Sequence, residues 1–267
     1  MACCCCCIPH YTNVSGPDIG RDVIKSHQMG SHTTTGDSMP LIEVALPPQQ
    51  CMISEPGAMS FSQKGIGMET IFDDGSSVNE PGCCTKCKTC CLRTCSGEGA
   101  SVAHWTNNSD SVRQMGFASP LPGHIVAIDL KTMPENMLFT MNGSFLFGAK
   151  GTRIDVARTD CKQCCCGAGL FFQKLDGDGK VFLNAGGTII KQNLNNETHR
   201  IDPASLVAFT KGLTIDVQRA GTCMTMCCGG EGMALTTISG EGDYWIASSP
   251  WSSQLAYALG FLPPKKS

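Results

Sequence analysis

The chain repeats one segment three times, and this repetition constrains the fold more than any other feature of the sequence. The three segments align without gaps on a Lys-Gly pair, at Lys64-Gly65, Lys150-Gly151 and Lys211-Gly212. An apolar stretch precedes each pair, and an alternating stretch that ends in an acidic residue follows it. This pattern predicts two half-buried strands joined by a tight turn in every repeat.

The flanks of the three segments extend the match. A strand-like stretch ending in leucine lies 17 to 20 residues before each lysine, at residues 41–46, 125–130 and 189–194, and a cysteine cluster with a glycine pair follows each lysine. One such unit has too few strands to bury a face, so the three units should pack together as one domain. We therefore predict an all-β fold, a β-sandwich or prism of three internal structural repeats over about residues 38–118, 119–184 and 185–250.

The two ends of the chain read differently from the repeats. Residues 1–37 are rich in Ser, Gly, Thr and His without a sustained period, which indicates a flexible, cysteine-rich N-terminal tail. Residues 251–267 form a short C-terminal segment, in which residues 251–261 fit a short closing helix. No stretch approaches 18 consecutive apolar residues, so we expect no transmembrane helix.

Several short motifs resemble the altered inheritance of mitochondria protein 24 family over roughly residues 41–250. The motifs are Glu55-Pro56-Gly57-Ala58-Met59, Leu121-Pro122-Gly123, Gly169-Leu170-Phe171-Phe172, Val181-Phe182-Leu183, Ile201-Asp202, Leu206-Val207-Ala208-Phe209 and Gly230-Glu231-Gly232. The resemblance implies a three-repeat β-sandwich similar to the tryptophan RNA-binding attenuation protein. It also implies a link to the mitochondrial inner membrane, with which fungal members are associated. The family supplies no catalytic residues to carry over.

Nineteen cysteines stand in this chain, an odd total that fits poorly with a closed set of disulfides. Five of them form an unbroken run that an acyltransferase can reach in a flexible tail: Cys3, Cys4, Cys5, Cys6 and Cys7. Two or more acyl chains anchor a protein stably to a membrane, whereas one binds marginally. We interpret this run as a lipidation site, with a metal-binding or redox-buffering tail as the alternative.

Thirteen further cysteines fall into three clusters, one in the same connection of each repeat. They are Cys83, Cys84, Cys87, Cys90, Cys91 and Cys95 in the first repeat, Cys161, Cys164, Cys165 and Cys166 in the second, and Cys223, Cys227 and Cys228 in the third. The two-residue spacing within Cys84–Cys87 and Cys161–Cys164 suits a tetrahedral metal, and soft thiolates select zinc or copper(I). Neighbouring lysines instead favour acylation or redox chemistry, and a third interpretation is that these loops carry no function. The remaining cysteine, Cys51, reads as a strand residue.

Other function classes find little support in the sequence. The net charge of −3 and the lack of an aromatic and basic stripe argue against nucleic-acid binding. No phosphate-binding loop, nucleophile elbow or catalytic histidine spacing is present, so we expect no enzymatic activity. The string Asp176-Gly177-Asp178-Gly179-Lys180 lacks the later ligands of a calcium loop and predicts a hairpin turn.

Two functional hypotheses follow. The first is a non-enzymatic, membrane-associated scaffold or organising protein with an acylated tail and with protein partners or copies of itself. In it, the three cysteine clusters form one cysteine-rich rim of the domain. The alternative is a cytosolic metal-binding or thiol-redox protein. Residues 1–40 contain Arg21 and Lys25 against three aspartates, which is untypical of a mitochondrial presequence. We therefore expect a cytoplasmic or peripheral-membrane location, with a mitochondrial one implied by the resemblance alone.

Overall fold

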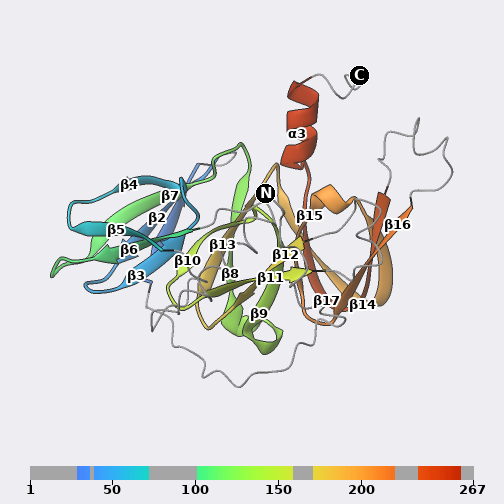
Figure 1. The fold of residues 1–267 in the computed structure, drawn as a ribbon, viewed down its shortest axis with the longest axis horizontal. Helices are drawn as coiled ribbons and strands as arrows, with labels where there is room; N and C mark the ends of the chain where they lie inside the picture. The colour runs from blue at the N-terminus through green and yellow to red at the C-terminus, as the bar shows by residue number, and fades with distance from the viewer. Residues whose placement is uncertain (1–28, 37–38, 72–100, 159–170, 220–233, 260–267) are drawn as a thin grey trace, which may run out of the picture.

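The computed structural model of the chain describes residues 29–36, 39–71, 101–158, 171–219 and 234–259. These residues form antiparallel strands almost throughout, which confirms the all-β prediction. Helix α3, Trp251–Ala258, lies where a short closing helix was predicted. Figure 1 shows the strands following one another along the long axis, from the first repeat at one end to the third repeat at the other.

The described part of the first repeat contains six strands. They are β2 Leu41–Leu46, β3 Cys51–Ser54, β4 Met59–Ser62, β5 Ile66–Ile71, β6 Val102–Asn107 and β7 Arg113–Ala118. Strands β2 and β4 pair with the two edges of β7, while β3 and β5 pair with the two edges of β6. The first repeat therefore contributes strands to two different sheets.

The second repeat follows the same pairing scheme. Its strands are β8 His124–Asp129, β9 Met137–Met141, β10 Phe145–Ala149, β11 Arg153–Arg158, β12 Phe171–Asp176 and β13 Lys180–Ala185. Strands β8 and β10 flank β13, and β9 and β11 flank β12. Two 3-10 turns, Leu130–Thr132 and Pro134–Asn136, connect β8 to β9.

The third repeat reaches the same pairing with fewer, longer strands. They are β14 Ile189–Ile201, β15 Leu206–Thr210, β16 Leu213–Arg219 and β17 Ala234–Ala247. Strands β14 and β17 pair along nearly their whole length, and β15 and β16 pair with opposite ends of β17. Each long strand thus takes the place of two strands of the other repeats.

Two ladders join the repeats to one another. Strand β3 of the first repeat pairs with β10 of the second, and β9 of the second pairs with β15 of the third. The resulting sheets have the orders β1-β2-β7-β4, β5-β6-β3-β10-β13-β8 and β11-β12-β9-β15-β17-β14. Backbone hydrogen bonds therefore run continuously across both junctions between repeats.

The Lys-Gly turns have the same local geometry in all three repeats. Gly65, Gly151 and Gly212 have φ values of +104°, +105° and +107°, a region that side chains with a Cβ rarely adopt. The Asp176-Gly177 segment is likewise the turn between β12 and β13, as predicted, with φ +147° at the glycine. Glycine at these positions explains why the repeats align without gaps through the turns.

The N-terminal boundary differs from our expectation. Residues His32–Thr35, which we assigned to the tail, form β1 and pair antiparallel with β2. Three of these four side chains are exposed, because β1 lies at a sheet edge. An edge strand of this kind has no hydrophobic alternation, so the sequence pattern does not predict it.

The core lies between the sheets and crosses the repeat boundaries. A row of stacked rings joins Phe117 of the first repeat to Phe147 and Phe182 of the second, with ring centroids 4.2 and 4.1 Å apart. All three rings are at most 1% exposed. The repeats therefore share their hydrophobic core as well as their backbone ladders.

Candidate functional site

The three cysteine clusters lie in topologically equivalent connections. The described strands end and resume at paired residues on either side of each connection: Ile71 with Val102, Arg158 with Phe171, and Arg219 with Ala234. The thirteen cysteines predicted as metal ligands all lie between these ends and outside the described residues. The predicted lipidation site, Cys3 to Cys7, also lies outside them.

The described parts of the chain offer no alternative metal centre. Within them, no group of three or more His, Cys, Asp or Glu side chains is arranged to hold a metal ion. No helix among the described residues is long and apolar enough to cross a membrane. The candidate sites predicted from sequence therefore rest on the cysteines, and the structure supplies the framework that carries them.

Cys51 differs from the clustered cysteines in its surroundings. It lies in β3 as predicted, and it is 3% exposed. Burial raises the pKa of its thiol, but hydrogen bonds with His104 and Thr106 and the nearby Lys150 charge outweigh burial and hold the pKa below the ordinary 9.0. Burial keeps reagents away from this thiolate-prone sulfur, so we assign Cys51 to the sheet interior and not to the rim.

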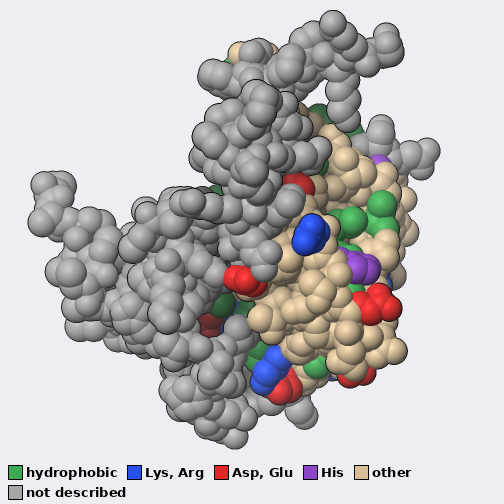
Figure 2. Space-filling model, turned by 90° about the vertical axis from the view of Figure 1, so that its right-hand side faces the viewer, with side chains coloured by type: hydrophobic (Ala, Val, Ile, Leu, Met, Phe, Trp, Pro, Cys, Tyr) green, Lys and Arg blue, Asp and Glu red, His purple; other side chains and the backbone are tan. Residues whose placement is uncertain are grey.

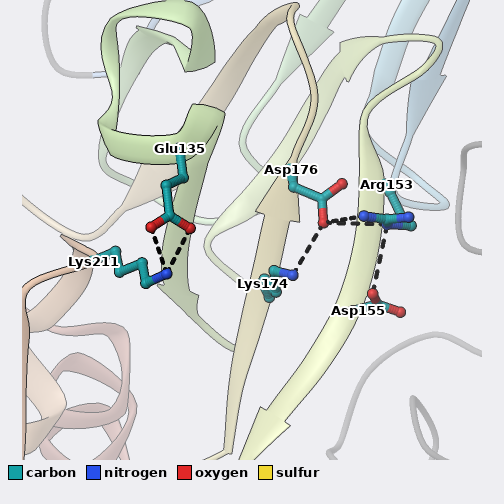
Figure 3. Close-up of polar contacts among 6 residues, drawn as sticks. All are labelled: Glu135, Arg153, Asp155, Lys174, Asp176 and Lys211. Carbon is teal, nitrogen blue, oxygen red and sulfur yellow. Dashed lines mark hydrogen bonds and ion pairs between the residues drawn. The ribbon is translucent and has the colours of Figure 1, made fainter. Parts of the chain in front are cut away.

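A cluster of four charged side chains lies on β11 and β12 (Figure 3). The Arg153 guanidinium donates to Asp176 Oδ2 at 2.6 Å through Nη2, and Lys174 Nζ lies 3.3 Å from the same oxygen. Asp155 approaches Arg153 Nε at 3.6 Å. The cluster lies at the turn end of the β11–β12 ladder, whereas the second cysteine-bearing connection leaves from its other end.

A second ion pair joins two repeats. Lys211 Nζ, in the third Lys-Gly turn, lies 2.6 and 2.5 Å from the two carboxylate oxygens of Glu135, just before β9 (Figure 3). The inter-repeat ladder between β9 and β15 brings the Lys211 side chain, which is 31% exposed, onto the neighbouring repeat.

A third polar cluster lies on the β14–β17 pair. Lys191 Nζ lies 2.8 Å from Asp243 Oδ2 and 5.4 Å from the centre of the Trp245 ring. Asn193 Nδ2 donates to Asp243 Oδ1 at 2.7 Å. Burial raises the pKa of Asp243, but the lysine and the amide lower it by more, so the pKa lies below the ordinary 3.8.

Sequence reasoning missed two further features, which are open sheet edges at the ends of the molecule. Strand β4 ends one sheet, and the last residues of β14 border another, with no further strand of the described chain on their outer sides. The signal was present, since the strand before Lys64 is MSFS while its counterparts are FLFGA and LVAFT. The polar strand is β4, whose outer edge no neighbouring repeat covers.

Comparisons with known proteins agree with this architecture. A crystal structure of protein SPYM3_0169 from Streptococcus pyogenes superposes with a TM-score of 0.67 at 22% identity, covering 88% of this chain and 100% of that one. This likeness shows a shared fold. The protein M6_Spy0233 of Streptococcus pyogenes serotype M6, described as uncharacterized, is 25% identical over 213 residues, 78% of this chain and 81% of its own length.

A family model also matches most of the chain. Residues 32–249, which begin at β1 and end just before α3, match the family described as Mitochondrial biogenesis AIM24. The match covers all three repeats and agrees with the resemblance carried by the sequence motifs. The chain therefore belongs to the mitochondrial biogenesis AIM24 family.

Proposed function

We propose that the chain is a non-enzymatic organising protein that associates peripherally with a membrane from the cytoplasmic side. The observation that carries the proposal is the placement of the cysteines. Three clusters occupy the same connection of three equivalent strand pairs, and a fourth run, Cys3 to Cys7, precedes the β domain. A rigid framework with cysteines at repeated positions suits the presentation of several modified or partner-binding loops.

The chemistry of the tail favours lipid attachment. Acylation of one thiol binds a membrane marginally, whereas two or more chains give stable anchoring, and the tail offers five thiols. Lys86, Lys88 and Lys162 stand beside clustered cysteines, and adjacent cations lower a thiol pKa and favour its reaction. The clustered cysteines are therefore a second set of thiols that can be acylated.

Membrane fractionation of the full-length chain in cells tests the anchor. We expect the wild-type chain in the membrane fraction, and we expect release by neutral hydroxylamine, which cleaves thioesters. A variant with Cys3 to Cys7 replaced by serine should become soluble. A variant with Cys161, Cys164, Cys165 and Cys166 replaced by serine is the matched control and should stay bound. Membrane association that survives both hydroxylamine and the tail replacement would contradict the proposal.

Metal binding is the second candidate, because the pairs Cys84–Cys87 and Cys161–Cys164 have the spacing of tetrahedral thiolate sites. Elemental analysis of protein purified without chelators should then show zinc or copper at near-stoichiometric amounts. Replacing Cys84 and Cys87 by serine should remove part of that metal, while replacing Cys51 should not. Metal-free protein with freely titratable thiols would exclude this candidate.

A further inference from the structure

The two ends of the molecule carry open strand edges. The equivalent edges at the two junctions between repeats are covered by a strand of the neighbouring repeat. Strands β10 and β15 are buried along their whole length, but in the equivalent β4 the last three residues are exposed. Phe61 of β4 is 36% exposed, whereas its counterparts Phe147 and Ala208 are 0% exposed. The same contrast separates β3 and β9, which are largely buried, from the end of β14, where three of residues 198–201 are not buried.

The internal junctions show what covers such edges. In the first junction Gly148 of β10 pairs with Ile53 of β3, and in the second Phe209 of β15 pairs with Phe139 of β9. Gly148 and Phe209 each lie two residues before the lysine of their turn, as Ser62 does in the first repeat. Ser62 is therefore the residue of β4 that lacks its inter-repeat partner within the described chain.

The missing partner is identified by the pairings inside each repeat. The acidic residue five positions after each lysine, Glu69, Asp155 or Asp216, pairs with a residue of the next strand. Those residues, His104, Lys174 and Thr237, pair in turn with Ile53, Phe139 and Arg200. Arg200 of β14 is thus the equivalent of Ile53 and Phe139, and its counterpart across a junction is Ser62.

A backbone feature marks the same equivalence. Gln49, Glu135 and Asn196 all have left-handed backbones, with φ values of 60°, 55° and 55°. They lie four residues before the equivalent residues Ile53, Phe139 and Arg200, the first two ahead of β3 and β9 and Asn196 at the register shift inside β14. Non-glycine residues rarely adopt this conformation, so its threefold recurrence shows that the edges have the same shape. The third edge is therefore formed like the other two, but no repeat follows it in this chain.

We propose that the open edge of β14 in one copy of this chain pairs antiparallel with β4 of a second copy, in the register of the internal junctions. Ser62 then pairs with Arg200, and the half-exposed Phe61 pairs with the buried Ile201. In this register the exposed Lys64 falls opposite Thr198, and its side chain can reach Asn196 and the exposed carboxylate of Glu197, as Lys211 reaches Glu135 in the second junction. Backbone pairing supplies affinity, and these side chains set the register.

A second copy suits these edges better than closure within one chain. Strand β4 lies at one end of the long axis and β14 at the other, so one chain cannot bring its own two edges together in this conformation (Figure 1). Figure 2 faces the end that carries β14, β16 and β17, and there hydrophobic, histidine and a few basic and acidic side chains lie among backbone and other side chains. A face without a large patch of one charge neither repels an identical chain nor makes burial in a contact costly. The contact is head to tail, so it generates a ring if the rotation closes and a filament if it does not.

Analytical ultracentrifugation of the purified full-length chain tests the proposal. Reductant and chelator are present, so that neither disulfides nor metal ions link the cysteines of different chains. The wild-type mass should rise above the 28.3 kDa chain mass with concentration. Ser62→Pro blocks one edge: Gln63 N–H donates to Gln114 of β7, so by alternation the Ser62 N–H points to the open side. Arg200→Pro blocks the other edge. Each variant alone should be monomeric.

Mixing the two variants separates head-to-tail pairing from other association. Ser62→Pro retains an intact β14 edge and Arg200→Pro retains an intact β4, so the mixture should form a species of twice the 28.3 kDa chain mass and nothing larger. A wild-type chain that stays monomeric at high micromolar concentration would overturn the proposal, as would single variants that still assemble or a mixture that stays monomeric. If Ser62→Pro lacks a cooperative unfolding transition, Phe61→Lys takes its place, because it puts a charge opposite Ile201.

Discussion

The ammonium of Lys211 and the carboxylate of Glu135 form an ion pair between the third and second repeats, although 76 positions separate them in the sequence. The backbone of Glu135 is left-handed, which is also the conformation of Gln49 and Asn196 at the equivalent positions. The contact thus combines a local feature of each repeat with the ladder that joins neighbouring repeats.

Removing this ion pair should weaken the domain only slightly. The two side chains are 31% and 58% exposed, and partly exposed ion pairs contribute about 0.2–1 kcal/mol. Glu135→Gln should therefore lower the free energy of unfolding in urea by that amount at low salt, and the loss should shrink at high salt. Glu69→Gln, at an exposed position of β5, is the control and should leave the stability unchanged. A loss that is independent of salt would mean that the effect is not electrostatic.

Substitutions of Gln49, the left-handed residue before β3, should differ strongly in their effect on stability. Gln49 has φ 60°, a region that glycine adopts freely and that β-branched residues avoid. Gln49→Val should therefore be less stable than Gln49→Gly by about 1–3 kcal/mol, measured by urea unfolding. The same two substitutions at exposed Thr70, in strand β5, should reverse the order, since valine favours strands. Equal stability of the two Gln49 variants would show that this backbone is not held in place.

Equivalent phenylalanines should differ in importance because only one of them lies at an internal junction. Phe147 is 0% exposed between the rings of Phe117 and Phe182, so Phe147→Ala should cost about 3–5 kcal/mol of unfolding free energy. Phe61 occupies the same position of the first repeat but is 36% exposed. Phe61→Ala should cost clearly less in dilute, monomeric protein. Similar losses for the two variants would contradict the assignment of β4 as an open end.

The cluster around Asp243 predicts a dependence of stability on pH. Lys191 and Asn193 hold the folded pKa of Asp243 below 3.8, so the carboxylate stabilises the fold at higher pH, and this contribution is lost as the pH falls through the folded pKa. Asp243→Asn should therefore destabilise the chain at neutral pH, and the difference from wild type should shrink below about pH 4. The comparison uses thermal unfolding at several pH values. Asp110→Asn, at an exposed position, should show no such trend.

Parts of this fold were predictable because they depend on local sequence. The Lys-Gly turns repeat at Lys64, Lys150 and Lys211 with nearly identical glycine φ values, and the apolar strands before Lys150 and Lys211 are buried as their composition suggests. Strand β1 was not predictable, because its side chains are polar and its order comes from pairing with β2. The fusion of four strands into β14 and β17 was also missed, since Gly240 and Gly242, which are typical turn residues, lie inside a continuous strand.

The candidate sites divide in the same way. The sequence placed all three cysteine clusters in one kind of connection, and the ladders on either side of residues 72–100, 159–170 and 220–233 agree with that placement. It could not show that Arg153 and Lys174 share the carboxylate of Asp176, because cross-strand neighbours depend on register.

By itself the sequence determined the strand class, the threefold repeat and the turns, because hydrophobic alternation and glycine conformation act over a few residues. Only the tertiary structure decided which strand of one repeat covers which strand of the next. That choice depends on backbone edges, which are chemically alike in every strand and carry no sequence signature. It made Lys211 a link between repeats, and it left β4 and the end of β14, unlike their counterparts at the two junctions, without a neighbour on their outer sides among the described residues.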